Sequence, residues 1–235
     1  MKIYEPRIIV ALDYKNEEDA MRFVELVNPS LCKLKVGKEL FTHTGPNFVS
    51  NLIKKGFDVF LDLKFYDIPS TVSKAVAAAD DMGVWMTDIH ASGGSKMMEE
   101  ARNTLDKNNS EMLIIAVTVL TSLSRSDLSE VGVSFSPEQQ VSKLASLAKK
   151  SGMDGVVASA LEAAELRNSY GDDFILVTPG IRHNLVTTND QKRIMTPSQA
   201  IFSGSNYLVI GRPITQASNP VNALKIVNDE ILSAL

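Results

Sequence analysis

Charged side chains interrupt an otherwise apolar, strand-like segment, VFLDLKFYDIPSTV, at residues 59–72. Asp62 and Lys64 stand two residues apart, and Asp67 follows three residues later, in the next turn. Because side chains alternate along a strand, Asp62 and Lys64 face the same side as Phe60. Unpaired charge in a protein core is strongly destabilising, so these charges are either paired or used in chemistry.

A second strand-like segment, LCKLKVG at residues 31–37, contributes two more lysines. Lys33 and Lys35 face one side of that strand, and only its closeness to the carboxyl end of the strand favours Lys35 as an active-site residue. An alternation of ammonium and carboxylate groups suits a reaction in which negative charge grows on carbon. A fixed ammonium stabilises the carbanion and then donates a proton, while neighbouring carboxylates hold it in place. The alternative interpretation is a structural cluster of ion pairs.

Short β-branched segments recur along the chain, with segments of helical period between them. The expected strands are 8–13, 31–37, 59–64, 84–90, 112–120, 155–160, 174–178 and 207–211. The expected helices include 46–55, 70–81, 95–107, 137–150 and 220–235. Near-continuous apolar strands that alternate with helices predict a parallel sheet, and eight such units predict a closed (β/α)8 TIM barrel. An open, doubly wound sheet is the alternative.

Polar side chains gather where this fold places its chemistry. Active sites of such barrels are built at the carboxyl ends of the strands and on the loops that follow them. The residues at or just beyond those ends are Asp13, Lys35, Asp62, Lys64, His90, Thr121, Arg182 and Arg212.

Two glycine–arginine motifs indicate a phosphate site. VIGRPIT ends the eighth expected strand with Gly211 and Arg212, and TPGIR ends the seventh with Gly180 and Arg182. An arginine binds phosphate through two parallel hydrogen bonds, and phosphate sites of (β/α)8 barrels commonly use these two loops. The polar stretch 187–194 is expected to form a loop over the site.

Length and composition limit the class of protein. With 235 residues and 44% hydrophobic content, residues 1–235 are expected to form one barrel domain. The net charge of −4 argues against a general nucleic-acid or membrane-surface binder. One cysteine, Cys32, excludes an internal disulfide, and the chain shows no signal peptide or membrane-spanning run, so a cytoplasmic protein is expected. No histidine pair has metal-ligand spacing.

The segment DLKFYDIPSTV at 62–72 closely resembles the DxKxxDIPxT signature of the orotidine 5'-monophosphate decarboxylase family, in its bacterial branch. Further motifs resemble that family in the same order over nearly the whole chain. They are ALD at 11–13, KVGKELFT at 35–42, IHASGG at 89–94, VTVLTS at 117–122, VTPGIR at 177–182, DQKRIMTP at 190–197 and VIGRPIT at 209–215. The resemblance implies decarboxylation of orotidine 5'-monophosphate to uridine 5'-monophosphate in pyrimidine biosynthesis, without cofactor or metal.

Residue by residue, the resemblance implies a charged array of Lys35, Asp62, Lys64 and Asp67. Lys64 would deliver a proton to C6 of the pyrimidine, and Asp62 would lie beside the departing carboxylate. In the family the second aspartate comes from the neighbouring subunit. Asp67 and Thr71 are therefore expected to complete the partner's site in a homodimer.

The resemblance also implies how the substrate is bound. Asp13 and Lys35 would bind ribose hydroxyls, and Thr121 would read the pyrimidine edge. The residues expected to hold the phosphate are Arg182, Gln191, Gly211 and Arg212, with Gln191 on the loop that closes over the substrate.

Three positions depart from the family pattern without touching the charged array. Tyr66 and Ser70 replace a histidine and an asparagine of the bacterial motif KFHDIPNTV, and His183 stands where proline is usual. These departures concern dimer contacts and the loop after the seventh strand.

Two rival functions remain open at this point. A magnesium-dependent decarboxylase or aldolase acting on sugar phosphates shares an Asp-x-Lys strand motif, but Lys35 and Lys64 would repel a cation. A non-catalytic barrel that binds a nucleotide as a sensor would not need the complete charged array.

Overall fold

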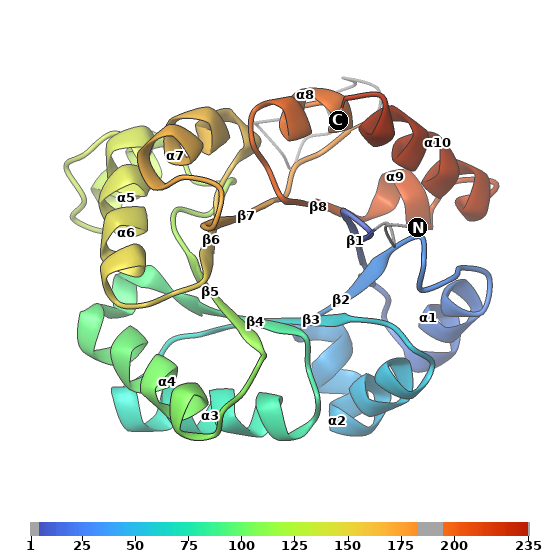
Figure 1. Ribbon diagram of the computed structural model, residues 1–235, viewed down its shortest axis with the longest axis horizontal. Helices are drawn as coiled ribbons and strands as arrows, with labels where there is room; N and C mark the ends of the chain where they lie inside the picture. Colours follow the sequence, from blue (N-terminus) through green and yellow to red (C-terminus); the bar gives the residue numbers. More distant parts are fainter. Residues whose placement is uncertain (1–4, 183–194, 235) are drawn as a thin grey trace.

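Eight parallel strands close into a barrel in the computed structural model, which describes residues 5–182 and 195–234 (Figure 1). Each strand pairs with the next one along the chain, and β8 pairs with β1. The strands are β1 (Ile8–Ala11), β2 (Lys33–Gly37), β3 (Val59–Phe65), β4 (Met86–His90), β5 (Leu113–Val117), β6 (Gly155–Val157), β7 (Ile175–Thr178) and β8 (Tyr207–Ile210). The expected TIM barrel is confirmed, and the doubly wound alternative is excluded because an open sheet would have two edges.

Helices surround the barrel on its outside (Figure 1). They are α1 (Glu17–Val24), α2 (Lys38–Lys54), α3 (Pro69–Asp81), α4 (Ser95–Lys107), α5 (Arg125–Glu130), α6 (Pro137–Lys150), α7 (Ala163–Tyr170), α8 (Pro197–Phe202), α9 (Arg212–Thr215) and α10 (Pro220–Leu232). Two short 3₁₀ helices, Ala91–Gly93 and Ala160–Glu162, follow β4 and β6. Residues that favour a helix start precede several helices. At α6, for example, the side chain of Ser136 accepts a hydrogen bond from the Gln139 N–H, and Pro137 occupies the first turn.

Helix α2 begins eight residues earlier than the sequence predicted. The prediction placed its start at Pro46, a favoured first-turn residue. The structure has a helical stretch on both sides of Gly45, which breaks the helix with φ = 68°. Threonine has low helix propensity, which hid the earlier stretch, and there the Thr42 and Thr44 hydroxyls donate to backbone carbonyls one turn back.

Several strands end sooner than expected. β1 ends at Ala11, β5 at Val117 and β8 at Ile210, so the polar residues that follow them stand in loops or at the start of a helix. Asp13, which was expected to end its strand, therefore stands in a loop, and Thr121 and Arg212 lie beyond their strands as expected; all three line the cavity at the carboxyl-end face.

The barrel contains two apolar layers. One lies between the strands and the outer helices and includes Leu34, Leu61 and Phe48. The other fills the barrel interior and consists of Ile9, Phe60, Met86, Ile115, Val177 and Tyr207. The predicted alternation along β1 and β3 is confirmed, since Ile9 and Phe60 point inward and Leu61 points toward the helices.

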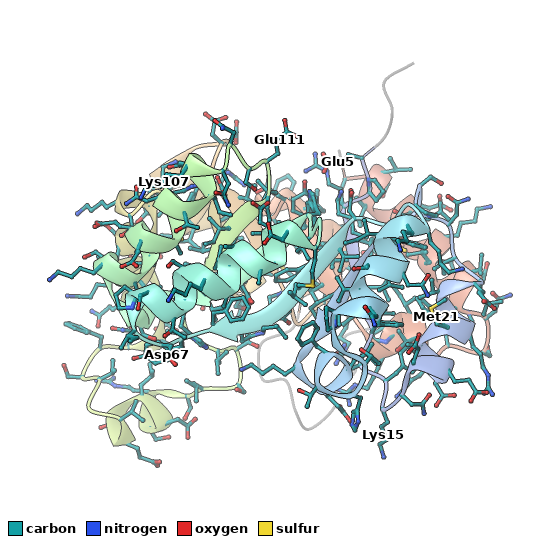
Figure 2. The ribbon with its side chains drawn as sticks, turned by 90° about the horizontal axis from the view of Figure 1, so that it is seen from below. Glu5, Lys15, Met21, Asp67, Lys107 and Glu111 are labelled. Atoms are coloured by element: carbon teal, nitrogen blue, oxygen red, sulfur yellow. The ribbon has the colours of Figure 1, made fainter. Side chains whose placement is uncertain are left out.

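Lys33 closes the end of the barrel opposite to the expected active site. Its ammonium lies 2.5 Å from Asp58 Oδ2, 3.4 Å from Glu5 Oε1 and 4.2 Å from the centre of the Trp85 ring. Figure 2 shows the two ends of the barrel: Glu5, before β1, lies at one end, and Asp67, after β3, lies at the other. The preference for Lys35 over Lys33 as a residue of the carboxyl-end face is therefore confirmed.

Across the described part of the chain, none of the helices combines the length and the apolar character needed to cross a bilayer.

The packing between α2 and the barrel gives a stability prediction. Phe48 is 1% exposed, and we expect Phe48→Ala to lower the free energy of unfolding by about 3–5 kcal/mol because a cavity replaces the ring. Phe202, at the end of α8, is 88% exposed and serves as the matched control. Phe202→Ala is expected to change stability by less than about 0.5 kcal/mol in the same urea titration. Equal effects of the two substitutions would contradict this packing.

Candidate active site

A cavity of about 410 Å³ opens at the carboxyl-end face of the barrel. That volume lies in the usual range for small-molecule sites. The expected site residues that line it are Asp13, Lys35, Asp62, Lys64, Thr121, Arg182, Gly211 and Arg212. Further lining residues that the sequence did not single out include Ser122, Pro179 and Gln216.

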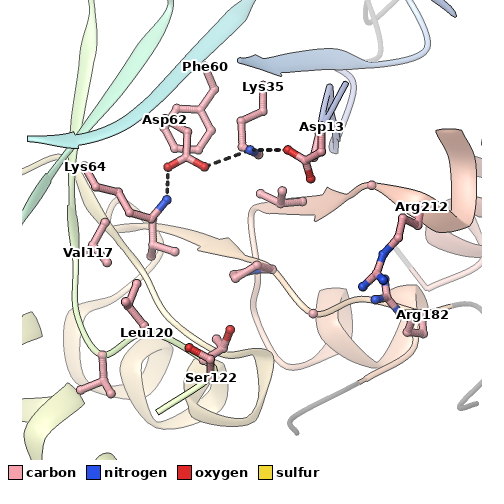
Figure 3. Close-up of a pocket in the computed structure, with 18 of the residues that line it drawn as sticks. Asp13, Lys35, Phe60, Asp62, Lys64, Val117, Leu120, Ser122, Arg182 and Arg212 are labelled. Carbon is pink, nitrogen blue, oxygen red and sulfur yellow. Dashed lines mark hydrogen bonds and ion pairs between the residues drawn. The ribbon is translucent and has the colours of Figure 1, made fainter. Parts of the chain in front are cut away.

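Four charged side chains form a continuous row along one wall of this cavity (Figure 3). The ammonium of Lys35 lies 3.3 Å from Asp13 Oδ1 and 3.1 Å from Asp62 Oδ2. The other oxygen of Asp62 accepts a hydrogen bond from the Lys64 ammonium. One carboxylate therefore binds two ammonium groups, each with a different oxygen.

The row is asymmetric in its exposure. Lys35 and Asp62 are buried, Lys64 is partly buried, and Asp13 stands at the exposed rim. Burial alone would raise the pKa of Asp62, but the charges of Lys35 and Lys64 outweigh it and lower that pKa. Burial would lower the pKa of Lys35, yet Asp62 and Asp13 raise it. Both groups are thus held in their charged forms inside the barrel.

Lys64 has an unusual backbone conformation that aims its side chain. Its φ is 51°, in the left-handed region that residues with a Cβ rarely adopt. The pairing of β3 with β4 shifts register between Leu61 and Phe65, at this same point. The Lys64 N–H, freed from regular pairing, donates to Asp88 Oδ1 at 2.8 Å. The conformation keeps Lys64 on the cavity side at the end of its strand.

Asp88 is a buried acid that the sequence reasoning missed. It lies on β4 and is 0% exposed, with its carboxyl group beside Asp62 and Lys64. A signal existed in the segment MTDIH, where alternation places Asp88 on the same face as Met86 of the barrel interior. An acid inside an apolar run with inward parity is the same signal that pointed to Asp62.

Two arginines face the cavity away from the charged row. Figure 3 shows Arg182, which follows β7, and Arg212, which begins α9, with their guanidinium groups close to one another. Gly211 lies between β8 and Arg212 and also lines the cavity. Two cations and a glycine backbone at one end of a cavity form a suitable site for a doubly charged anion.

Asp67 and Thr71 lie outside this cavity. Both are exposed, and Asp67 Oδ1 accepts a hydrogen bond from the Ile68 N–H at 2.6 Å. The apolar side chains on either side of Asp67, Tyr66 and Ile68, are 62% and 64% exposed. Gln191, His183 and the stretch 187–194 lie outside the described residues.

His90 is near the row without lining the cavity. Its ring packs against the Tyr66 ring with 5.8 Å between centroids. Burial lowers the pKa of His90, and the charges of Lys38 and Lys64 lower it further. Within residues 5–182 and 195–234, no cluster of three or more His, Cys, Asp or Glu side chains has the arrangement of a metal site.

Comparison with known proteins gives a consistent result. Residues 6–227 match the model of the "Orotidine 5'-phosphate decarboxylase / HUMPS family". The chain is 55% identical over 232 residues to the orotidine 5'-phosphate decarboxylase of Psychromonas ingrahamii, covering 98% of this chain and 99% of that protein. It is 58% identical over 225 residues to the enzyme of Vibrio atlanticus, covering 95% and 97%. The crystal structure of orotidine 5'-phosphate decarboxylase from Lactobacillus acidophilus superimposes with a TM-score of 0.87 at 38% identity, covering 97% of this chain and 99% of that one.

The shared carboxylate gives a pH-dependent stability prediction. We expect Asp62→Asn to lower the free energy of unfolding by about 3–5 kcal/mol at neutral pH, because it leaves the buried Lys35 ammonium and the partly buried Lys64 ammonium without their common partner. The pKa of Asp62 is lowered in the folded protein, so its stabilising effect is present above the pKa of an unfolded Asp and is lost as the pH falls toward the folded value. The difference between variant and parent should therefore shrink below about pH 4.

Urea titrations at several pH values measure this difference. Asp106→Asn is the control, since Asp106 pairs with Arg102 at 2.8 Å on the surface of α4 and should contribute less than about 1 kcal/mol. A difference for Asp62→Asn that stays constant as the pH falls would contradict the ion-pair arrangement.

Proposed function

The chain belongs to the orotidine 5'-phosphate decarboxylase / HUMPS family, and on this premise we propose that its charged row performs the decarboxylation with Lys64 as the proton donor. The protein is a cofactor-independent carboxy-lyase that converts orotidine 5'-monophosphate to uridine 5'-monophosphate in pyrimidine biosynthesis. The observation that supports the roles most strongly is the Asp13–Lys35–Asp62–Lys64 row along the cavity wall.

The reaction breaks the bond between C6 of the pyrimidine and its carboxylate. Carbon dioxide leaves, and the electron pair of that bond remains on C6, where the ring delocalises it poorly. The Lys64 ammonium first stabilises this charge and then transfers a proton to C6, which gives the product. Neutral Lys64 regains its proton from solvent after the product leaves. No aspartate acts as a base in this sequence.

The proposed role of Asp62 follows from its position next to Lys64. In the proposed binding mode the substrate carboxylate lies beside Asp62, and Asp62 could then assist the reaction in two ways. Repulsion between the two carboxylates would favour departure of carbon dioxide, and the ion pair holds the Lys64 ammonium in place. Lys35 contributes to keeping Asp62 ionised in either case, because its positive charge and that of Lys64 together outweigh the effect of burial.

The cavity offers complementary contacts for the rest of the nucleotide. Arg182, Arg212 and the Gly211 backbone are proposed to bind the phosphate. Asp13 and Lys35 are proposed to bind ribose hydroxyls, a role that fits the exposure of Asp13 at the rim. Binding of the phosphate at a distance from C6 would contribute to catalysis by holding the substrate in register with Lys64.

Two further assignments belong to this proposal. Thr121, in the loop between β5 and α5, would read the pyrimidine edge, with Ser122 beside it in the cavity lining. Gln191 would join the phosphate site from the loop after β7. The single-domain organisation of residues 1–235 and the cytoplasmic location stay predictions.

A homodimer with shared active sites also belongs to the proposal. Asp67 and Thr71 are exposed at the carboxyl-end face, outside the cavity of their own chain. Exposed Tyr66 and Ile68 flank Asp67, and apolar side chains of this kind are typical of a surface that a partner covers. Asp67 from one subunit would then complete the array of the other.

Turnover by matched lysine variants tests the role of Lys64. With orotidine 5'-monophosphate and EDTA, the parent protein is expected to show the ultraviolet change of conversion to uridine 5'-monophosphate. Lys64→Met should lower kcat by at least about 100-fold, the usual loss when a general acid is removed. Lys33→Met removes a buried ammonium at the opposite end of the barrel and should leave kcat of the folded protein within about threefold.

The same assay separates the rival functions. Activity of the parent that disappears with EDTA and returns with magnesium would favour a metal-dependent enzyme for sugar phosphates. Tight binding of the nucleotide without turnover would favour a sensor. Full activity of Lys64→Met would contradict the assignment of the proton donor, whatever the parent protein does.

Subunit mixing tests the shared site. Lys64→Met and Asp67→Asn should each be nearly inactive alone. In a mixed dimer, one site holds Lys64 from one chain and Asp67 from the other, while the second site holds both substitutions. Equal mixing with subunit exchange makes half of the dimers mixed, each with one intact site of two, so activity should return to about a quarter of the parent value. No return of activity in samples that light scattering shows to contain dimers would contradict a shared site.

A further inference from the structure

Asp88 is a fully buried acid next to the reacting groups, and the mechanism above does not use it. It lies on β4 in the barrel interior, two residues after Met86 and two before His90. Acidic side chains are almost never fully buried unless they have partners. The contacts of its two oxygens therefore indicate what it does.

The two oxygens of Asp88 have different surroundings. Oδ1 accepts a hydrogen bond from the Lys64 backbone N–H at 2.8 Å. Oδ2 is buried and receives no hydrogen bond from any described group, and the Lys64 ammonium lies 3.8 Å from it. The carboxyl group of Asp62 is within hydrogen-bonding reach of Asp88. Two carboxyl groups can share a hydrogen bond only when one of them carries a proton.

The charges around Asp88 decide which carboxyl carries that proton. Asp62 binds two ammonium groups, which keep it ionised. Among the described groups, ionisation of Asp88 is favoured by the Lys64 ammonium, 3.8 Å away, and by the hydrogen bond from the Lys64 N–H. Burial raises the pKa of Asp88, and the negative charge of Asp62 raises it further. The facing positions of β5, Ile115 and Val117, are apolar, and His90 on β4 itself has a lowered pKa and is only half-buried.

Protonation of Asp88 would give both of its oxygens a hydrogen-bond partner. Oδ1 accepts from the backbone of Lys64, and a proton on Oδ2 would be donated to Asp62. The contact with the Lys64 backbone supports the left-handed conformation of Lys64, which lies in the register shift between β3 and β4. One side chain on β4 thus contacts both the carboxylate that pairs with Lys64 and the backbone that directs it.

We propose that Asp88 is a positioning residue that donates a hydrogen bond to Asp62 and accepts one from the Lys64 backbone, and so fixes the direction of the Lys64 ammonium. This inference rests on the proposed function, because the direction of Lys64 matters only if Lys64 transfers the proton. Asp88 does not touch the substrate and is not a catalytic residue.

Three variants of β4 test the proposal in the decarboxylation assay. Asp88→Asn keeps a donor and an acceptor of the same shape, so its kcat should stay within about threefold of the parent value. Asp88→Leu removes both contacts at similar volume and should lower kcat by at least about 100-fold, with KM within about threefold, since the phosphate contacts are untouched. Thr87→Val is the control: Thr87, next to Asp88 on β4, donates a buried hydrogen bond to the Leu61 carbonyl of β3, and the variant that lacks this bond should keep kcat.

Kinetic outcomes that differ from these overturn the proposal. A loss of kcat in Asp88→Asn as large as in Asp88→Leu would mean that an ionised carboxylate is needed. Normal kcat in Asp88→Leu would mean that Lys64 is directed without it. Loss of activity in Lys64→Met together with normal kcat in Asp88→Leu would refute the role of Asp88 and leave the proposed function intact. Full activity in Lys64→Met would refute the proposed role of Lys64.

Infrared spectroscopy gives a readout that does not depend on turnover or on the folding of Asp88→Leu. The parent protein at neutral pH should show the C=O band of a protonated carboxyl group, which shifts in D2O and disappears in Asp88→Asn. Asp154→Asn, which changes a half-buried acid outside the cavity, should keep the band. Absence of the band from the parent protein, or its persistence in Asp88→Asn, would refute a protonated Asp88.

Discussion

The active-site face depends on one carboxylate, that of Asp62, which the ammonium groups of buried Lys35 and partly buried Lys64 share. Asp62 and Asp13 raise the pKa of Lys35 against the effect of burial, and the charges of Lys35 and Lys64 lower the pKa of Asp62 in the same way. A charged group that is buried without a partner would destabilise the fold, whereas here each charge is paired with a neighbour of opposite sign. The array therefore exists in its charged form before any substrate binds, as electrostatic catalysis requires.

The (β/α)8 barrel allows these charges to be paired inside the protein. Its interior is packed with apolar side chains below the array, and a second buried lysine, Lys33, is neutralised separately at the far end. Parallel strands deliver Lys35 and Asp62 side by side, because β2 and β3 are neighbours in the sheet. The irregular end of β3 then turns Lys64 into the cavity. Regularly paired parts of β2 and β3 position Lys35 and Asp62, and the irregular end of β3 positions Lys64, the proposed proton donor.

Much of this arrangement could be predicted from the sequence. Alternation along a strand placed Phe60, Asp62 and Lys64 on one face, and the carboxyl-end rule for barrels brought Asp13 and Arg212 to the same cavity. The prediction for Phe60 and Asp62 succeeds because side-chain parity is a local property of the strand, whereas Lys64 reaches the same cavity through the irregular end of β3. The closed order of the strands followed from their number and their apolar character.

Other features could not be predicted, for physical reasons. The left-handed backbone of Lys64 depends on a hydrogen bond from another strand, and no local signal marks a lysine for that conformation. The importance of Asp88 depends on which side chains face it, which strand order alone does not specify. The helical stretch before Gly45 was missed because its threonines have poor helix propensity. The family motif predicts a role for Asp67, but Asp67 is exposed, and a role in the active site would require a second subunit.

The role of the charged row can be tested with a crystal structure that contains a uridine 5'-monophosphate analogue with negative charge at C6. We expect Lys64 Nζ to lie within hydrogen-bonding reach of the charged substituent, at about 2.6–3.2 Å, while it still contacts Asp62. The phosphate should lie between Arg182 and Arg212. A bound analogue with the opposite orientation, or with Lys64 turned away from C6, would contradict the claim that this preformed row of charges performs the reaction.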